Sequence, residues 1–313
     1  MKSSDVILVV YLFFLVITAV AANSLMWIVV IKRKLTQKVH YYFILSLAAS
    51  DFLNALFKIP TSILLRFDRN WYPHYGLCYV TTPMGVLFGA ASVFSLSVIA
   101  VNRYFVISSP LSYMEMMPPA FARVIVAGIW FGAIILALPP IMWREPSEIC
   151  RSGAVSVDHY LSEVLYFVLG LWLFVIIIPS VVMFVSYLRI YLIARGHSAR
   201  IVTQHSQSQD KQTRKRHRDI KAAVVLAVIG GIFIICWFPF FVVQSLHKFG
   251  TKVDPVYFAI FLCVMYSNST LDPVVLFLFN AEIRAAFKKF FCRGCRRVNP
   301  GISEIATVNG QSR

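Results

Sequence analysis

Three charged side chains interrupt or end long apolar stretches, and they are the residues that offer chemistry. Asp51 lies near the middle of residues 41–65, and Lys58 follows seven residues later, two helical turns along the same face. A carboxylate at membrane depth is costly unless it faces a polar interior, so Asp51 indicates either a binding site or a packing hydrogen bond. Lys58 either extends outward along its aliphatic stem or holds a ligand. Arg103 lies near the end of residues 76–108.

No catalytic pattern accompanies these charges. The sequence has no phosphate-binding glycine loop, no H-E-x-x-H metal-ligand spacing and no G-x-S-x-G nucleophile elbow. The triplet that starts at Asn268 matches a glycosylation acceptor, but it lies inside an apolar stretch and is discounted. We therefore expect a protein that is not an enzyme and requires no cofactor.

Seven apolar stretches account for most of the 313 residues. Charged residues make up only 14% of the chain, against about 25% in ordinary soluble domains. Apolar stretches of 18 or more residues are typical of transmembrane helices. We expect an all-α membrane protein, a seven-transmembrane helix bundle within one domain, residues 1–291. Its predicted spans are 6–31, 41–65, 76–107, 121–143, 160–194, 222–247 and 255–279.

The third span organises the others. Cys78 and Arg103 are 25 residues apart, which a helix converts into roughly 37 Å at about 1.5 Å per residue. The hydrocarbon core of a bilayer is about 30 Å thick. One helix therefore places the thiol on one side of the membrane and the guanidinium on the other.

The formal net charge of +16 follows from topology and does not indicate a nucleic-acid partner. With the N-terminus outside, the inner segments carry 22 of the 30 lysine and arginine residues. Basic residues concentrate on the cytoplasmic side of membrane proteins, where they meet anionic lipid. We expect a multi-pass protein of the plasma membrane with an extracellular N-terminus and a cytoplasmic C-terminus.

The six cysteines divide by depth. Cys78 and Cys150 fall on the outer side, where oxidation permits a disulfide, and Cys150 is the external partner available to Cys78. Two cysteines inside spans are assigned to packing. Cys292 and Cys295 follow the last span among basic residues, a position that suits palmitoylation.

A short amphipathic helix is predicted after the seventh span. Residues at about 280–291 place apolar side chains at helical spacing with basic side chains between them. This pattern is typical of a helix that lies in the membrane interface. The remaining residues, 292–313, are expected to form a short cytoplasmic tail.

An ordered set of motifs on these spans resembles the rhodopsin-like, or class A, G-protein-coupled receptors. The resemblance extends from about residue 23 to residue 295. Each motif alone is weak, but their common order on seven spans is specific. The set comprises Asn23, LAASD ending at Asp51, Cys78, Asn102-Arg103-Tyr104, Trp130, Pro179 with Tyr187, CWFP at 236–239 and Asp272-Pro273.

This resemblance implies a receptor that transmits ligand binding to a heterotrimeric G protein by helix movement at Pro239. Arg103 matches the arginine that reaches the G protein, and Asp219 matches the acid that restrains it. The acid that normally precedes this arginine is replaced by Asn102, so raised ligand-independent signalling is expected. Leu276 replaces the tyrosine that normally meets Tyr187 in the active state. Other positions matching activation or G-protein contact are Val93, Tyr104, Pro110, Leu111, Pro179 and Phe233.

The resemblance also implies a buried sodium pocket. Asp272 stands where most family members have asparagine. Two carboxylates this close cannot both ionise cheaply, so either a cation bridges them or one stays protonated. We expect Na⁺ as an allosteric ion, with hydrogen bonding alone as the alternative. The matching residues are Asp51, Ser92, Asn268, Ser269 and Asp272.

The nearest pattern is that of the biogenic-amine receptors, with one departure. Phe240 and Phe241 follow Trp237, and Tyr266 lies on the seventh span, as in that group. The amine-binding aspartate, however, is replaced by Gly85. The serines that meet catechol hydroxyls are also absent, with Leu171 and Val175 at those places. Gly85 and Gly89 are expected to enlarge the cavity.

We therefore expect a neutral or acidic small molecule, or a lipid, as ligand, with Lys58 near it. An amine held by cation–π contacts in the aromatic cage is the alternative. Val86, Gln244 and Leu262 complete the expected ligand-binding set.

Two other classes of protein fit this pattern less well. A light-sensing opsin needs a lysine in the seventh span, and Tyr266 occupies that place. A transporter or channel often shows inverted repeats, which this chain lacks. Beyond the G protein and the ligand, membrane lipids and arrestin are the expected partners.

Overall fold

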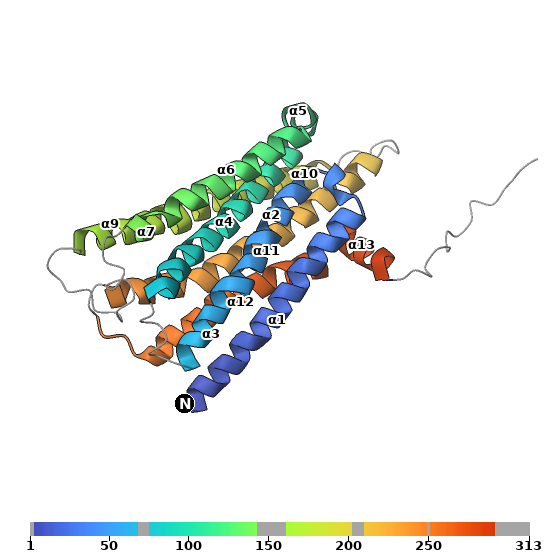
Figure 1. Ribbon diagram of the computed structural model, residues 1–313. Helices are drawn as coiled ribbons and strands as arrows, with labels where there is room; N and C mark the ends of the chain where they lie inside the picture. The colour runs from blue at the N-terminus through green and yellow to red at the C-terminus, as the bar shows by residue number, and fades with distance from the viewer. Residues whose placement is uncertain (1–2, 68–74, 143–160, 202–209, 249–250, 292–313) are drawn as a thin grey trace, which may run out of the picture.

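The computed structural model describes residues 3–67, 75–142, 161–201, 210–248 and 251–291. Within these ranges every regular element is a helix, and the long helices lie side by side in an elongated bundle (Figure 1). In the part of the chain that the structure describes, seven helical segments are long and apolar enough to cross a membrane. The predicted fold class is confirmed.

The bounds of the spans agree with the apolar stretches, while the helices of the fifth and sixth spans extend beyond them. In chain order the spans are α1 (Ser3–Lys32); α2 (His40–Leu53) with η2 (Asn54–Lys58) and α3 (Ile59–Phe67); α4 (Tyr75–Ser108); α6 (Pro119–Ala137); α9 (Leu161–Leu171) with η3 (Trp172–Ile177) and α10 (Ile178–Ile201); α11 (Asp210–Lys248); and α12 (Pro255–Phe279). The shorter helices are η1 (Leu35–Gln37), α5 (Pro110–Met116), α7 (Pro139–Met142) and α13 (Ala281–Phe291).

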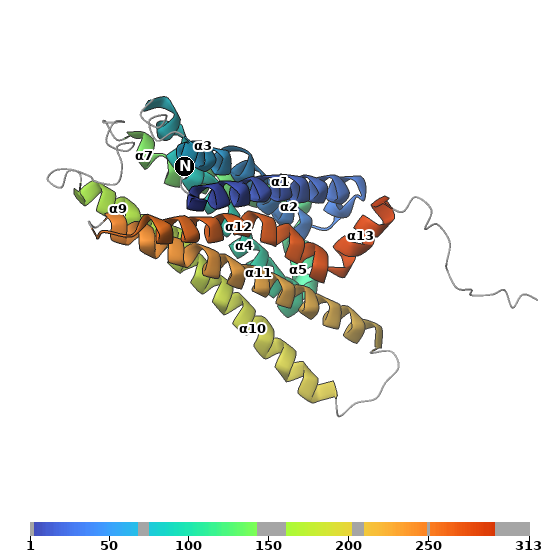
Figure 2. The same ribbon diagram turned by 90° about the horizontal axis from the view of Figure 1, so that it is seen from below.

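Helix α13 is the predicted amphipathic helix. Its buried side chains, Ile283, Ala286 and Phe287, recur at helical spacing, and Lys288 and Lys289 are exposed. Figures 1 and 2 show α13 leaving the end of α12 and lying beside the end of α1. The predicted tail, 292–313, lies outside the described residues.

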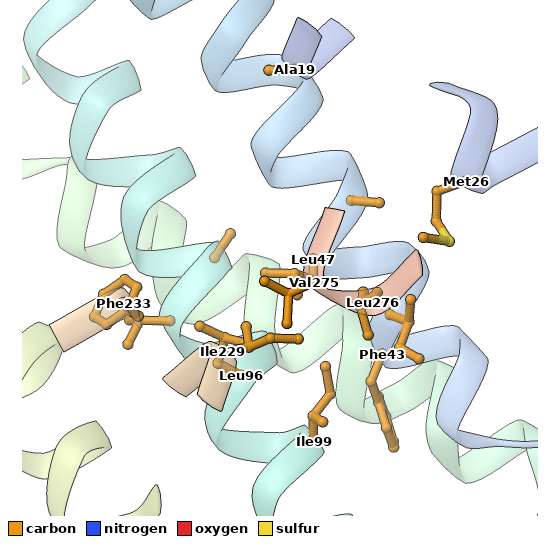
Figure 3. Close-up of a cluster of buried hydrophobic side chains, with 14 of the residues drawn as sticks. Ala19, Met26, Phe43, Leu47, Leu96, Ile99, Ile229, Phe233, Val275 and Leu276 are labelled. Carbon is orange, nitrogen blue, oxygen red and sulfur yellow. The ribbon is translucent and has the colours of Figure 1, made fainter. Parts of the chain in front are cut away.

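Helix α4 is the central element of the bundle. It packs against α2, α6, α10 and α11, as both ribbon views show (Figures 1 and 2). The core contains a cluster of apolar side chains from α1, α2, α4, α11 and α12 (Figure 3). Leu96 of α4 and Phe43 of α2 are almost fully buried there, together with Ile229 and Phe233 of α11 and Leu276 of α12. The third span is therefore the packing centre.

Large apolar side chains cover the outside of the bundle. Phe14 and Ile17 of α1, Phe131 of α6 and Phe184 of α10 are each more than half exposed. Such a surface would be an aggregation liability in water, and it suits a helix that faces lipid.

Two spans contain a π-helical turn, which the sequence pattern did not predict. The turns are η2 and η3, and each ends two residues before a proline, Pro60 and Pro179. Proline lacks the backbone N–H and crowds the carbonyl of the preceding turn, so a wider turn relieves the conflict. A wider turn also rotates the following residues about the helix axis.

Candidate functional site

Lys58 extends from η2 across the face of Gly85 on α4. A Cβ atom built on Gly85 would lie 3.0 Å from Lys58 Cε and 3.7 Å from Nζ. The lysine side chain is partly buried, and no carboxylate lies within 4.0 Å of its ammonium in the described part of the chain. The absence of a side chain at position 85 thus leaves room for the end of the Lys58 side chain against α4.

Gly89 accommodates the indole ring of Trp237. A Cβ atom on Gly89 would overlap Trp237 Cη2 and lie 3.0 Å from Cζ3. The expectation that Gly85 and Gly89 enlarge a cavity is therefore wrong. Side chains from η2 and α11 fill the space that the two glycines leave.

Aromatic rings surround Trp237 on α11. Its ring stacks on Phe233 at a centroid distance of 5.3 Å and lies 5.9 Å from Phe241. Trp172 of η3 meets Phe241 edge-on at 5.6 Å and donates its indole N–H to Ser245 Oγ at 2.8 Å. The indole nitrogen of Trp237 is buried without a hydrogen-bond partner. We call Lys58, Gly85, Gly89, Trp237 and Phe241 the Gly85 site.

The other predicted ligand-binding residues lie around this site or beside it. Tyr266 is 1% exposed, and its hydroxyl lies 2.8 Å from Ser62 Oγ, so it is committed to packing between α12 and α3. Val175 of η3 is buried, and the ring of Phe240 is tilted against that of Phe258 with the centroids 5.6 Å apart. Four further residues of the predicted set are partly buried and have no described polar contact with Lys58: Val86, Leu171, Gln244 and Leu262.

A second group of polar residues, the acid site, lies in the core between α2, α4 and α12. All five of its members are at most 3% exposed; they are Asp51, Ser92, Asn268, Ser269 and Asp272. Asn268 Nδ2 donates to Asp272 Oδ2 at 3.1 Å. Asn54 Nδ2 donates to Ser269 Oγ at 3.1 Å, and Asn23 Nδ2 donates to the Ser269 carbonyl at 2.9 Å. The structure therefore brings together all five residues that the sequence grouped.

Oxygen atoms of the acid site lack partners. Asp51 Oδ2, Asp272 Oδ1, Ser92 Oγ and Asn268 Oδ1 are buried and accept no hydrogen bond. Buried polar atoms are nearly always satisfied, so several orphaned oxygens in one place indicate a missing partner. Hard cations prefer carboxylate, hydroxyl and amide oxygens. The donor set fits Na⁺, although the described residues contain no group of three or more His, Cys, Asp or Glu side chains suited to a metal.

At the other end of α4, Asn102 and Arg103 are buried. Tyr113 of α5 donates its hydroxyl to Asn102 Oδ1 at 2.7 Å, while Asn102 Nδ2 has no partner. Burial raises the pKa of the Tyr113 phenol, against the opposing effects of the nearby Arg103 charge and the bond to Asn102. The phenol therefore stays a neutral donor at physiological pH. We call this region the Arg103 end.

The remaining activation residues are distributed over the core and this end. Tyr187 lies near Arg103 and packs with Ile107 and Ile190, whereas Leu276 is buried in the apolar core. Leu111 is 82% exposed on α5, and Pro110 begins that helix. The remaining members of the set are Val93, buried in α4; Tyr104, partly buried beside Phe105; and the helix prolines Pro179 and Pro239.

Several predictions fall outside what the structure describes. These are the pairing of Cys78 with Cys150, the side chain of Asp219, and palmitoylation at Cys292 and Cys295. Cys236 is buried in α11, and Cys263 is partly buried in α12.

Sequence reasoning missed four polar partners. Asn54 and Ser62 lie near Asp51 and Lys58 in sequence, so their spacing was a usable signal. Ser245 and Tyr113 gave no such signal in the sequence. The contact of Ser245 depends on the π turn that contains Trp172, and that of Tyr113 depends on the fold of α5.

Comparison with known proteins agrees with this geometry. A family model described as 7 transmembrane receptor (rhodopsin family) matches residues 22–276. The histamine H2 receptor of Cavia porcellus is 31% identical over 303 residues, covering 95% of this chain and 82% of that receptor. The D(1) dopamine receptor of Carassius auratus is 28% identical and covers 95% of this chain and 90% of its own length. The octopamine receptor beta-2R of Chilo suppressalis is 28% identical, with 91% and 80% covered.

These matches span the same helices that hold the Gly85 site, the acid site and the Arg103 end. They leave no role for the transporter or channel alternative. The chain belongs to the rhodopsin family of seven-transmembrane, G-protein-coupled receptors, and it is a receptor of the plasma membrane, not an enzyme.

Proposed function

We propose that this receptor activates heterotrimeric G proteins in response to a neutral or acidic small molecule, or a lipid, bound at the Gly85 site. The single observation that carries the ligand class is the contact of Lys58 with Gly85. An ammonium that is partly buried and has no carboxylate partner among the described residues disfavours a cationic ligand and attracts an anionic one.

The other polar group of the site supports the same ligand class. Trp237 presents a buried N–H without a partner, and it lies against the glycine four residues beyond Gly85. Both Lys58 and Trp237 are hydrogen-bond donors with no acceptor function of their own. A ligand with a carboxylate or carbonyl group would satisfy either of them.

An amine ligand is the second candidate. The relatives reported above are named as histamine, dopamine and octopamine receptors. The centroid of the Phe241 ring lies 5.6 Å from that of Trp172 and 5.9 Å from that of Trp237. Aromatic rings of this kind bind cations by about 0.5–2 kcal/mol each. Lys58 opposes this candidate, because two cations at one site repel.

The orientation of the receptor is part of the proposal. An extracellular N-terminus puts the basic segments, the Arg103 end and α13 in the cytoplasm, where Leu111 is exposed for contact with a G protein or arrestin. Palmitoylation of Cys292 and Cys295 and a disulfide between Cys78 and Cys150 fit this orientation.

We further propose raised basal activity and a sodium ion in the acid site. Asn102 offers Arg103 no carboxylate, so the inactive arrangement has one ionic restraint fewer. The orphaned oxygens of Asp51 and Asp272 would hold Na⁺, and its charge would allow both carboxylates to stay ionised.

The test of ligand class uses three compounds that share one skeleton: phenylacetic acid, phenylacetamide and phenethylamine. GDP release from a heterotrimer is measured with purified receptor in lipid nanodiscs. We expect the acid or the amide to be active, and Lys58→Met to weaken the acid at least about tenfold, because a desolvated charge pair is lost.

Lys252→Met is the matched control, since that lysine is exposed outside the spans. An acid response that survives Lys58→Met would remove the acidic-ligand argument. Selective activation by phenethylamine would favour the amine candidate.

A further inference from the structure

An apolar crevice of about 510 Å³ lies between α1, α12 and α13. Its walls include Ala22 of α1, Phe277 of α12, and Phe287 and Phe291 of α13. Among the residues that line it, Lys288 carries the only charge. Figure 2 shows the three helices meeting where α13 leaves the bundle.

The position of α13 is fixed by specific contacts, so the crevice is a built feature. Asn280 Oδ1 accepts the backbone N–H groups of Glu282 at 3.0 Å and Ile283 at 3.3 Å, which starts the helix at the end of α12. Glu282 in turn pairs with Lys38 at 2.6 Å, and Ile283 is fully buried. These contacts hold α13 under α1.

The charges beside the crevice are positive. Glu282 is the only acid of α13, and its pairing with Lys38 neutralises it. Lys288 is exposed, and no carboxylate lies within 4.0 Å of it among the described residues. Arg33 lies over the ring of Phe290, with 6.0 Å from its guanidinium carbon to the ring centroid.

We propose that this crevice binds an anionic phospholipid, with an acyl chain between the apolar walls and the charged headgroup at Lys288. Apolar walls cannot satisfy the backbone N–H and C=O groups of a peptide, whereas a hydrocarbon chain needs no such partners. The spans α1 and α12 end at Lys32 and Phe279, so the lysine lies near the depth of the headgroups. The orientation proposed above puts it in the cytoplasmic leaflet, which is rich in anionic lipid.

The test measures lipid adducts by native mass spectrometry of the full-length receptor in detergent, titrated with phosphatidylserine or phosphatidylcholine. Lys288→Gln should weaken the phosphatidylserine adduct about fivefold. Lys289→Gln is the matched control, because Lys289 neighbours Lys288 but does not line the crevice. We expect it to change the adduct less than twofold.

A second pair of variants tests the acyl chain. Ala22→Phe should fill the crevice and remove the adduct of both lipids, while Ala21→Phe, exposed on the same turn of α1, should not. Both variants are first checked for an unchanged thermal unfolding midpoint. Because all these readings concern lipid alone, they are independent of the proposed ligand and its response.

Three outcomes would overturn the proposal. The first is equal retention of phosphatidylserine and phosphatidylcholine by the unsubstituted receptor, and the second is an equal effect of the two lysine variants. The third is a phosphatidylserine adduct that forms only after hydroxylamine removes thioester-linked acyl chains, since the crevice would then hold an acyl chain of the receptor itself.

Discussion

Two regions of α4 are completed in different ways. At Gly85 and Gly89 the helix leaves space, and side chains of η2 and α11 fill it to van der Waals contact. At Asn102 the helix offers polar atoms, and only the oxygen finds a described partner, Tyr113, while the buried amide nitrogen has none. The Gly85 site is therefore tightly packed, and the Arg103 end is incompletely satisfied. We infer that steric contact resists small structural changes at the Gly85 site, whereas the Arg103 end changes its arrangement readily.

The two glycines also differ from each other. The atoms that approach Gly85 belong to the far end of a flexible lysine, whereas those that approach Gly89 belong to a rigid ring held by Phe233 and Phe241. A ligand that draws Lys58 away needs only a rotamer change. Moving Trp237 requires several rings to move together. In the function proposed above, position 85 would serve recognition of the ligand and position 89 transmission of the signal.

The largest expected effect is that of Gly89→Ala. The new methyl group would overlap Trp237, and overpacking a core of this kind costs about 1–3 kcal/mol. We expect a lower thermal unfolding midpoint, followed by tryptophan fluorescence in detergent, and altered basal GDP release because the ring is displaced.

Gly128→Ala in α6 is the matched control, because an added methyl group meets nothing within 4 Å there. It should leave the midpoint unchanged or raise it slightly, since alanine favours a helix over glycine. If Gly89→Ala were as stable as Gly128→Ala, the packing at Gly89 would not be tight and the comparison of the two glycines would fail.

The next effect is that of Gly85→Asp. The carboxylate would lie beside Lys58, whose flexible end can give way, and would pair with its ammonium. We expect the response to an acidic ligand to fall at least about tenfold, measured as the half-maximal concentration for GDP release.

The double variant Gly85→Asp with Lys58→Met separates charge from space. The double variant places a carboxylate without a lysine partner at position 85. It should therefore respond to phenethylamine better than to phenylacetic acid. A double variant that still prefers the acid would show that the ligand does not contact this pair.

Sequence reasoning predicted the spans, the central place of the third helix and the membership of the acid site. It succeeded there because apolar length, depth and motif order are local properties of the chain. It failed at Gly85 and Gly89, where it expected open space, because the occupants come from other helices. The π turn before Pro60 was also missed, because helical periodicity does not reveal it.

The smallest of these effects is expected at the other end of α4, from Asn102→Asp. The carboxylate can accept the Tyr113 hydroxyl, as the amide does, and it adds an anion next to Arg103. This should favour the inactive arrangement and lower basal GDP release about threefold to tenfold. Combining Asn102→Asp with Tyr113→Phe tests whether the two act through one network, since independent contributions would be additive. Unchanged basal GDP release in Asn102→Asp would mean that the polar deficit at Asn102 does not control activation.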